Sequence, residues 1–265
     1  MDNLYENYRT QKKVLLEAIV ERDYMEIYQS NILKTDFIIK LGEPRYELHI
    51  LELTIARTRL KLEMMQTCIQ MQIPIDSQHI DSTLEKEFQK HFGMLKVMKS
   101  EIESVHKMND QNEELVKVAV EAKRLYSSIA ERLHPELAVV DDKKSNRLWK
   151  AAKTAYENKD SEKLRKLYSR VMKEYPDNVE LEAEPPIEIK KAVKVLRSKT
   201  KNVLSEIASL KKQFPFNEAK LLEDDEALEK SRKDIAFEIR IAREFLDKLE
   251  KQVLEKLPPA GKFLH

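Results

Sequence analysis

Glycine is scarce in this chain, with only 3 among 265 residues. Hairpin turns and β-bulges commonly need glycine, so this scarcity argues against a protein built from strands and tight turns. Aromatic residues are also few, at 7%, whereas 36% of the residues are charged. Long segments rich in Glu, Lys, Leu and Ala, with regularly spaced apolar residues, instead predict an all-α protein whose helices are solvated on one side.

Cysteine and long apolar runs are equally sparse. Cys68 is the only cysteine, which excludes an internal disulfide framework and favours a reducing compartment. Apolar runs such as residues 37–39 are far too short to cross a bilayer, and polar residues 5–9 do not suit a signal peptide. The 48 basic and 47 acidic residues give a formal net charge of +1, so no overall field favours nucleic acid. We therefore expect a cytoplasmic protein that binds neither membrane nor nucleic acid.

Sequence patterns of catalytic chemistry are missing as well. There is no glycine-rich phosphate loop, no catalytic triad and no paired-carboxylate pattern, so we do not expect an enzyme or a bound cofactor. Glu103 and His106 have the Glu-x-x-His spacing of di-iron bundles, but the motif occurs once, which favours a solvated pair over a metal site. Cys68, beside Met64 and Met65, is interpreted as a buried thiol, because no histidine is placed to activate it.

The N-terminal region, residues 1–110, has apolar residues at alternating three- and four-residue spacing, which is typical of coiled coils. Gly42 and Pro44 favour a helix end followed by a helix start. We therefore predict that the first helix folds back through this turn and packs against the helix of residues 46–72. A break at residues 73–76 then precedes a third helix.

The C-terminal region, residues 176–265, contains two further apolar seams, within residues 189–214 and 228–253. Residues 214–217 (Phe-Pro-Phe-Asn) interrupt the helical pattern between them. Two seams joined by a short turn predict an antiparallel helical hairpin that pairs within one chain.

The middle region, residues 111–175, has a different pattern centred on Leu133-His134-Pro135-Glu136. Upstream, apolar residues recur at helical spacing, and Pro135 is expected to end that helix because proline has no amide donor and disfavours helical geometry at His134. A second helix follows the loop, and a short third helix follows residues 158–161. The apolar spacing assigns the core of this module to Tyr126, Ile129, Leu133, Trp149, Ala155 and Tyr156.

Two antiparallel helices joined by a loop that begins with His-Pro resemble the J-domain of DnaJ-type co-chaperones. The match covers residues 126–136 (YSSIAERLHPE) and continues with Ala155-Tyr156 late in the next helix. Family members carry tyrosine, an aliphatic-alanine pair and His-Pro-Asp, with Ala-Tyr in the following helix. The resemblance spans roughly a quarter of the chain and implies a J-like helical module. The apolar seams before and after this module predict that long antiparallel coiled-coil helices flank it.

The resemblance also implies a function and the residues that perform it. His134, Pro135 and Glu136 would form the loop that contacts a DnaK-class chaperone ATPase. A basic docking face would lie on the preceding helix, at Lys117, Lys123, Arg124 and Arg132. The chain departs from the family in having Glu136 in place of aspartate, and Ser127 and Ser128 where basic residues are usual.

Two functions follow from these patterns. The first is a co-chaperone whose module stimulates ATP hydrolysis by a DnaK-class partner while the coiled coils bind a client or another protein partner. The second is a structural adaptor in which the J-like module is a packing unit and the coiled coils make the contacts. The client and the oligomeric state stay open at this point.

Overall fold

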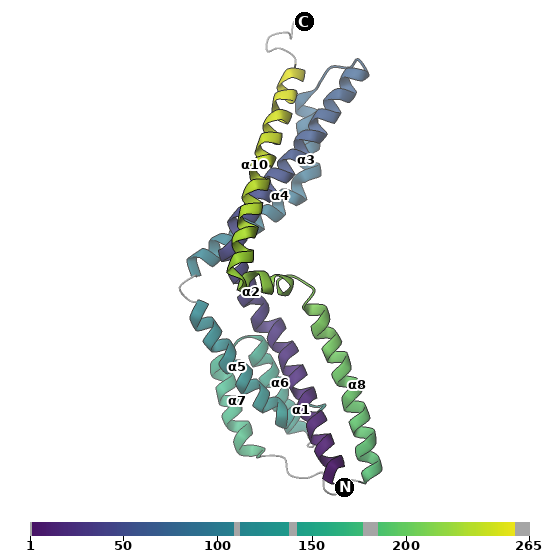
Figure 1. The fold of residues 1–265 in the computed structure, drawn as a ribbon, viewed down its shortest axis with the longest axis vertical. Helices are drawn as coiled ribbons and strands as arrows, with labels where there is room; N and C mark the ends of the chain where they lie inside the picture. The colour runs from purple at the N-terminus through teal and green to yellow at the C-terminus, as the bar shows by residue number, and fades with distance from the viewer. Residues whose placement is uncertain (1, 109–111, 138–141, 177–184, 258–265) are drawn as a thin grey trace. The chain divides into compact units, whose positions relative to one another are not determined.

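The computed structural model describes residues 2–108, 112–137, 142–176 and 185–257 (Figure 1). Every regular element in these ranges is helical, so the predicted all-α class is confirmed. None of the helices in the described part of the chain is long and apolar enough to span a membrane.

Helical residues run without a break from Asp2 to Gln70. This run comprises α1 (Asp2–Tyr24), a π-helical turn η1 (Met25–Gln29), α2 (Ser30–Phe37), a second π-helical turn η2 (Ile38–Gly42) and α3 (Glu43–Gln70). The predicted turn at Gly42 and Pro44 is therefore wrong. Pro44 lies in the first turn of α3, directly after η2, where a missing amide donor is tolerated. Gly42 is helical, and a Cβ added there would lie 3.2 Å from Cγ2 of Ile38, so glycine serves close packing here.

The chain folds into two units, each built from two separate stretches of sequence. Unit one contains residues 1–34 and 110–219, and unit two contains residues 35–109 and 220–265. These boundaries differ from the three consecutive regions expected from the sequence. The difference arises because the N-terminal helical run and the C-terminal segment each contribute helices to both units.

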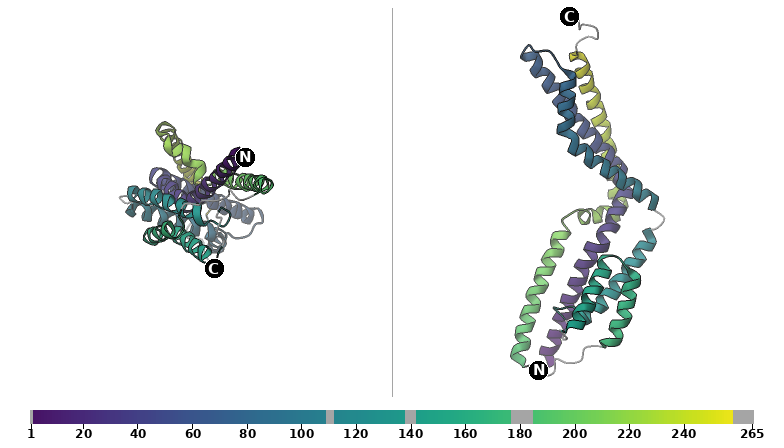
Figure 2. Two further views of the ribbon diagram at one scale, coloured as in Figure 1. Left: turned by 90° about the horizontal axis from the view of Figure 1, so that it is seen from below. Right: turned by 180° about the vertical axis from the view of Figure 1, so that it is seen from behind.

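Unit one combines α1 with α5 (Asn112–Leu133), α6 (Lys143–Glu157), α7 (Ser161–Glu174) and α8 (Pro186–Leu210). The helices α5, α6 and α7 pack against one another, and α1 packs against both α5 and α8 (Figures 1 and 2). One apolar core joins all five helices, with Leu15 and Ile19 of α1 and Leu196 and Val203 of α8 among its buried members. The module of residues 111–175 therefore shares its core with the two flanking helices.

Local capping explains where α6 and α7 begin. The Asp142 carboxylate accepts hydrogen bonds from the amides of Lys144 and Ser145, and Ser145 completes a capping box with the Asp142 backbone. Asp160 accepts a hydrogen bond from the Lys163 amide in the same manner at the start of α7.

Unit two is built around α3, which packs against α4 (Ser77–Met108) and α10 (Asp225–Lys256). The short helices η4 (Phe216–Glu218) and α9 (Ala219–Glu223) precede α10 in the chain. Leu41 and Leu48 pack with Leu228, Ile235 and Ile239 of α10 in one apolar cluster. A second cluster joins α3 and α4 through Met65, Ile80, Leu84 and Phe88.

The pairing predicted for the C-terminal hairpin is wrong. The seam on α8 packs against α1, and the seam on α10 packs against α3. Most positions of the α8 seam and about half of those on α10 are buried, because apolar spacing determines which face of a helix avoids water. It carries no information about which other helix covers that face.

Candidate functional site

The helices α5 and α6 run antiparallel, and their aromatic contacts establish the direction. Near the end of α5, the His134 ring meets the Trp149 ring edge-on, with centroids 4.7 Å apart. Two turns earlier on α5, the Tyr126 ring stacks on the Tyr156 ring, with centroids 4.0 Å apart. Earlier positions on α5 therefore meet later positions on α6, so the His-Pro-Glu segment begins the connection between two antiparallel helices.

The module core lies where the apolar spacing placed it. All of the assigned core side chains are buried and belong to the same cluster: Tyr126, Ile129, Leu133, Trp149, Ala155 and Tyr156. Leu137, the last residue of the described range 112–137, is buried in this cluster too. Leu115, which continues the same spacing toward the start of α5, is exposed instead, so the buried face of α5 begins near Ala119.

His134 is half-buried rather than directed fully into solvent. Its Nδ1 accepts a hydrogen bond from the Glu136 amide at 3.2 Å, and its ring rests against Trp149. Burial lowers the pKa of His134, and the opposing attraction of the Glu136 carboxylate is smaller. The neutral imidazole is therefore the favoured form, which matches its role as a hydrogen-bond acceptor.

The other two residues of the predicted contact loop are exposed. The Glu136 carboxylate pairs with the Lys199 ammonium of α8 at 3.5 Å, and both side chains are partly solvated. Such an ion pair contributes little stability, about 0–1 kcal/mol, so it can be exchanged for another cation at modest cost.

The predicted basic docking face is divided between exposed and engaged side chains. Lys117 is exposed, and Arg124 is exposed above the Tyr168 ring. Lys123 pairs with Glu21 of α1 at 2.5 Å and lies over the Tyr24 ring. The Arg132 guanidinium donates to the Tyr175 carbonyl at 3.0 Å, which ties the end of α5 to the end of α7.

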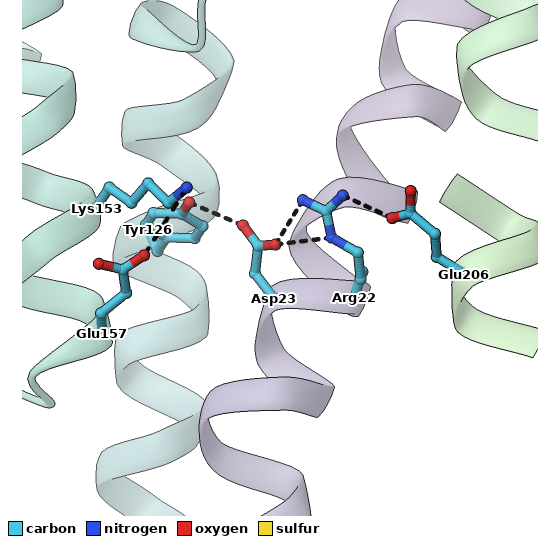
Figure 3. Close-up of polar contacts among 6 residues, drawn as sticks. All are labelled: Arg22, Asp23, Tyr126, Lys153, Glu157 and Glu206. Atoms are coloured by element: carbon cyan, nitrogen blue, oxygen red, sulfur yellow. Dashed lines mark hydrogen bonds and ion pairs between the residues drawn. The ribbon is translucent and has the colours of Figure 1, made fainter. Parts of the chain in front are cut away.

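A partly buried polar network connects α1 to this module, and no sequence pattern indicated it (Figure 3). The Tyr126 hydroxyl donates to Oδ2 of Asp23 at 2.9 Å. Arg22 donates from Nε and one terminal nitrogen to Oδ1 of Asp23, at 3.0 and 2.8 Å. Its other terminal nitrogen donates to Glu206 of α8 at 2.9 Å. The network therefore links α5, α1 and α8 through Arg22 and Asp23.

Burial and neighbouring groups shift the pKa values of Tyr126 and Arg22 in this network. Burial raises the pKa of Tyr126, and the neighbouring Asp23 carboxylate adds to the effect because a second negative charge there is unfavourable. Burial alone would lower the pKa of Arg22, but its hydrogen bonds to Glu206 and Asp23 outweigh burial and raise it. Tyr126 therefore stays a neutral donor and Arg22 stays a cation.

Two tyrosine hydroxyls near the network are buried without a hydrogen-bond partner among the described residues. They belong to Tyr28, in the π-helical turn η1, and Tyr156, whose ring centroids lie 5.1 Å apart. Burial raises the pKa of Tyr28 to about 12. Burying these hydroxyls is unfavourable, because no hydrogen bond among the described residues replaces the ones they would make to water.

The contrast between two stacked tyrosines gives a matched pair of variants. Tyr126→Phe leaves the buried Asp23 carboxylate without one of its donors and is expected to lower the free energy of unfolding by about 1–3 kcal/mol. Tyr156→Phe removes an unpartnered hydroxyl and is expected to leave the free energy of unfolding unchanged or raise it. Denaturant titration followed by fluorescence of Trp149, the single tryptophan, reports on unit one. Equal losses in the two variants would contradict the assigned hydrogen bonding.

Residues considered for metal or nucleophilic chemistry lie outside this module. His106 of α4 pairs with Glu43 of α3 at 3.5 Å, and Glu103 pairs with Lys99. In the described ranges, no three histidine, cysteine, aspartate or glutamate side chains come together as metal ligands would. Cys68 of α3 is partly exposed rather than fully buried, which differs from the expected buried thiol.

Comparison with known proteins identifies no relative of this chain. No family model, curated protein or solved structure matches the chain.

Proposed function

We propose that this protein contacts a DnaK-class chaperone ATPase through the loop of His134, Pro135 and Glu136, and stimulates its ATP hydrolysis. The loop begins the connection between two antiparallel helices, with Pro135 and Glu136 exposed and His134 braced by Trp149. The single observation that supports this proposal is the fixed imidazole, which anchors the exposed Glu136 through its backbone amide. A preorganised loop loses less conformational entropy on binding than a flexible one.

The helices outside the module fit a client or partner role in the same proposal. Unit two exposes apolar side chains on α10, including Phe237 and Ile241, next to a well-packed face toward α3. A reducing, cytoplasmic location agrees with the single cysteine.

A second candidate function is a structural adaptor that no longer stimulates a chaperone. The observation in its favour is that some of the module's charges are engaged by other helices of the chain. Glu136 pairs with Lys199, and Lys123 pairs with Glu21. A basic face used in this way packs α1 and α8 against the module instead of presenting free charge to a partner.

Single-turnover ATP hydrolysis by the host's own DnaK-class chaperone distinguishes the two functions. Under the co-chaperone proposal the wild-type protein raises the hydrolysis rate, and Glu136→Asp preserves or increases this stimulation because it restores the family's shorter carboxylate. Lys199→Gln frees Glu136 from its internal partner and is expected to leave stimulation intact or increase it.

An absence of stimulation by wild type, Glu136→Asp and Lys199→Gln alike would favour the adaptor. Stimulation that persists when Glu136 is replaced by glutamine would instead contradict the role given to this carboxylate, because a partner that contacts it should respond to the loss of its charge.

A further inference from the structure

A cavity of about 510 Å³ lies between α1 and the C-terminal end of α5, within unit one. Four basic side chains contribute to its lining: Arg9, Lys12 and Lys13 of α1 and Arg132 of α5. Its volume falls in the range typical of small-molecule sites, roughly 300–1,000 Å³. The positive side chains come from two helices that are distant in the sequence, so the cavity exists only because α1 packs against α5.

The charges that line this cavity do not cancel. Two carboxylates also face it, and each has a cationic partner in the lining. Glu17 pairs with Lys13 at 4.0 Å, and Glu131 pairs with Arg132 at 3.6 Å. Arg9 and Lys12 form no ion pair within the described part of the chain. The lining therefore carries two more positive than negative charges.

Lys12 is the less solvated of these two cations. Its side chain is half-buried, whereas Arg9 is exposed. Burial lowers the pKa of Lys12, and the Glu131 carboxylate opposes this shift only in part. An anion placed in the cavity would replace the water that the Lys12 ammonium has lost.

The uncharged residues of the lining indicate which class of anion fits the cavity. The half-buried Ser127 supplies a hydroxyl, and Leu16 and Leu137 supply aliphatic surface. No aromatic ring is among the described lining residues, so the cavity offers no stacking surface for a nucleobase. An arginine fork and a lysine together suit the oxygens of a phosphate group.

We propose that this cavity binds a phosphomonoester dianion with a short aliphatic body. Arg9 and Lys12 neutralise its two charges, and the Ser127 hydroxyl donates to a further phosphate oxygen. The Leu16 and Leu137 side chains contact the carbon skeleton. This site is separate from the chaperone-contact proposal, since it requires neither His134 nor Glu136.

Calorimetric titration of the full chain at low ionic strength tests the proposal, with glycerol 3-phosphate as the soluble probe. A second arm uses phosphatidylcholine vesicles that contain phosphatidylinositol phosphate, which present the same group on a lipid. Lys12→Gln and Arg9→Gln are each expected to weaken binding of glycerol 3-phosphate about tenfold or more, because each removes a charge-assisted contact. Glu17→Gln is expected to tighten it, because one negative charge leaves the lining.

Lys117→Gln is the matched control, since it makes the same charge change at an exposed site on α5 outside the cavity. The affinity of this variant for glycerol 3-phosphate should stay within about threefold of that of the wild-type protein. Helical circular dichroism of each variant establishes that unit one remains folded. If the wild-type protein binds the vesicles as well as glycerol 3-phosphate, and Lys12→Gln and Arg9→Gln weaken both, the lipid headgroup is a source of the ligand.

Three outcomes would overturn the proposal. One is the absence of glycerol 3-phosphate binding by the wild-type protein, whether or not vesicles bind. Another is equal weakening by Lys117→Gln and Lys12→Gln, which would indicate a general response to net charge. The third is wild-type affinity in both Lys12→Gln and Arg9→Gln.

Discussion

Under the co-chaperone proposal, replacing His134 with glutamine is expected to reduce stimulation of the DnaK-class ATPase by at least about tenfold. The His134 ring packs against Trp149, and its Nδ1 holds the Glu136 amide. Glutamine has hydrogen-bonding groups but no ring, so the loop loses its brace and the Glu136 carboxylate loses its position. A partner's hydrogen bond to the positioned Glu136 carboxylate would contribute about 1.5–3 kcal/mol, and its loss corresponds to a tenfold or larger fall in rate.

The matched control for this variant is His79→Gln, the same substitution at an exposed histidine of α4 in unit two. Its stimulation should equal that of the wild-type protein. Single-turnover ATP hydrolysis measures both variants alongside the wild type. If wild type stimulates hydrolysis and His134→Gln stimulates it equally, the loop is not the contact surface.

Replacing Trp149 with alanine is expected to cause the largest loss of stability of any change considered for unit one, about 3–5 kcal/mol. Trp149 is 7% exposed and stacks on Tyr126, with ring centroids 5.4 Å apart, besides supporting His134. Alanine would remove the ring from between α5 and α6 and leave a cavity there. Trp149→Phe should cost less, because a smaller ring still fills part of the space.

Denaturant titration followed by helical circular dichroism measures this loss, because the variant lacks the fluorescent side chain. Phe237→Ala is the control for removing an aromatic ring, since Phe237 of α10 is 55% exposed. Its effect should stay within about 0.5 kcal/mol. A comparable loss in Phe237→Ala and Trp149→Ala would contradict the packing described for Trp149.

Local patterns in the sequence anticipated the helices of the module more successfully than their partners. Tyr126, Ile129 and Leu133 share one helical face by spacing alone, and all three are buried. The end of α5 at Leu133 follows from Pro135, and the start of α4 at Ser77 follows from the break at Pro74. These features depend on neighbouring residues, which a sequence displays directly.

The pairing of helices could not be predicted in the same way. An apolar stripe on α8 is satisfied by any complementary stripe, and α1 and α10 both carry one. The continuity of the helix through Pro44 depends on the π-helical turn before it, which has no reliable sequence pattern. The first error concerns how distant segments meet and the second concerns a local backbone feature, and both changed the boundaries expected for the units.

The polar network at Asp23 was missed for a related reason. Asp23 is one of 47 acidic residues and belongs to no recognisable motif. Only the packing of α1 against α5 makes it a buried acceptor for Tyr126. The same packing brings Lys12 beside Ser127, so the cavity could not be anticipated from either helix alone.

The module of residues 111–175 shares its core with α1, so we expect it to be stable only when α1 packs against it. Native-state hydrogen exchange of the full chain tests this expectation by comparing the amides of Leu15–Val20 in α1 with those of Leu125–Leu133 in α5. If α1 and α5 share one core, the best-protected amides of both segments should exchange through the same opening, with equal free energies and equal dependence on denaturant. Exchange of the α1 amides at a much lower free energy, while α5 stays protected, would show that the module folds without α1 and contradict the account.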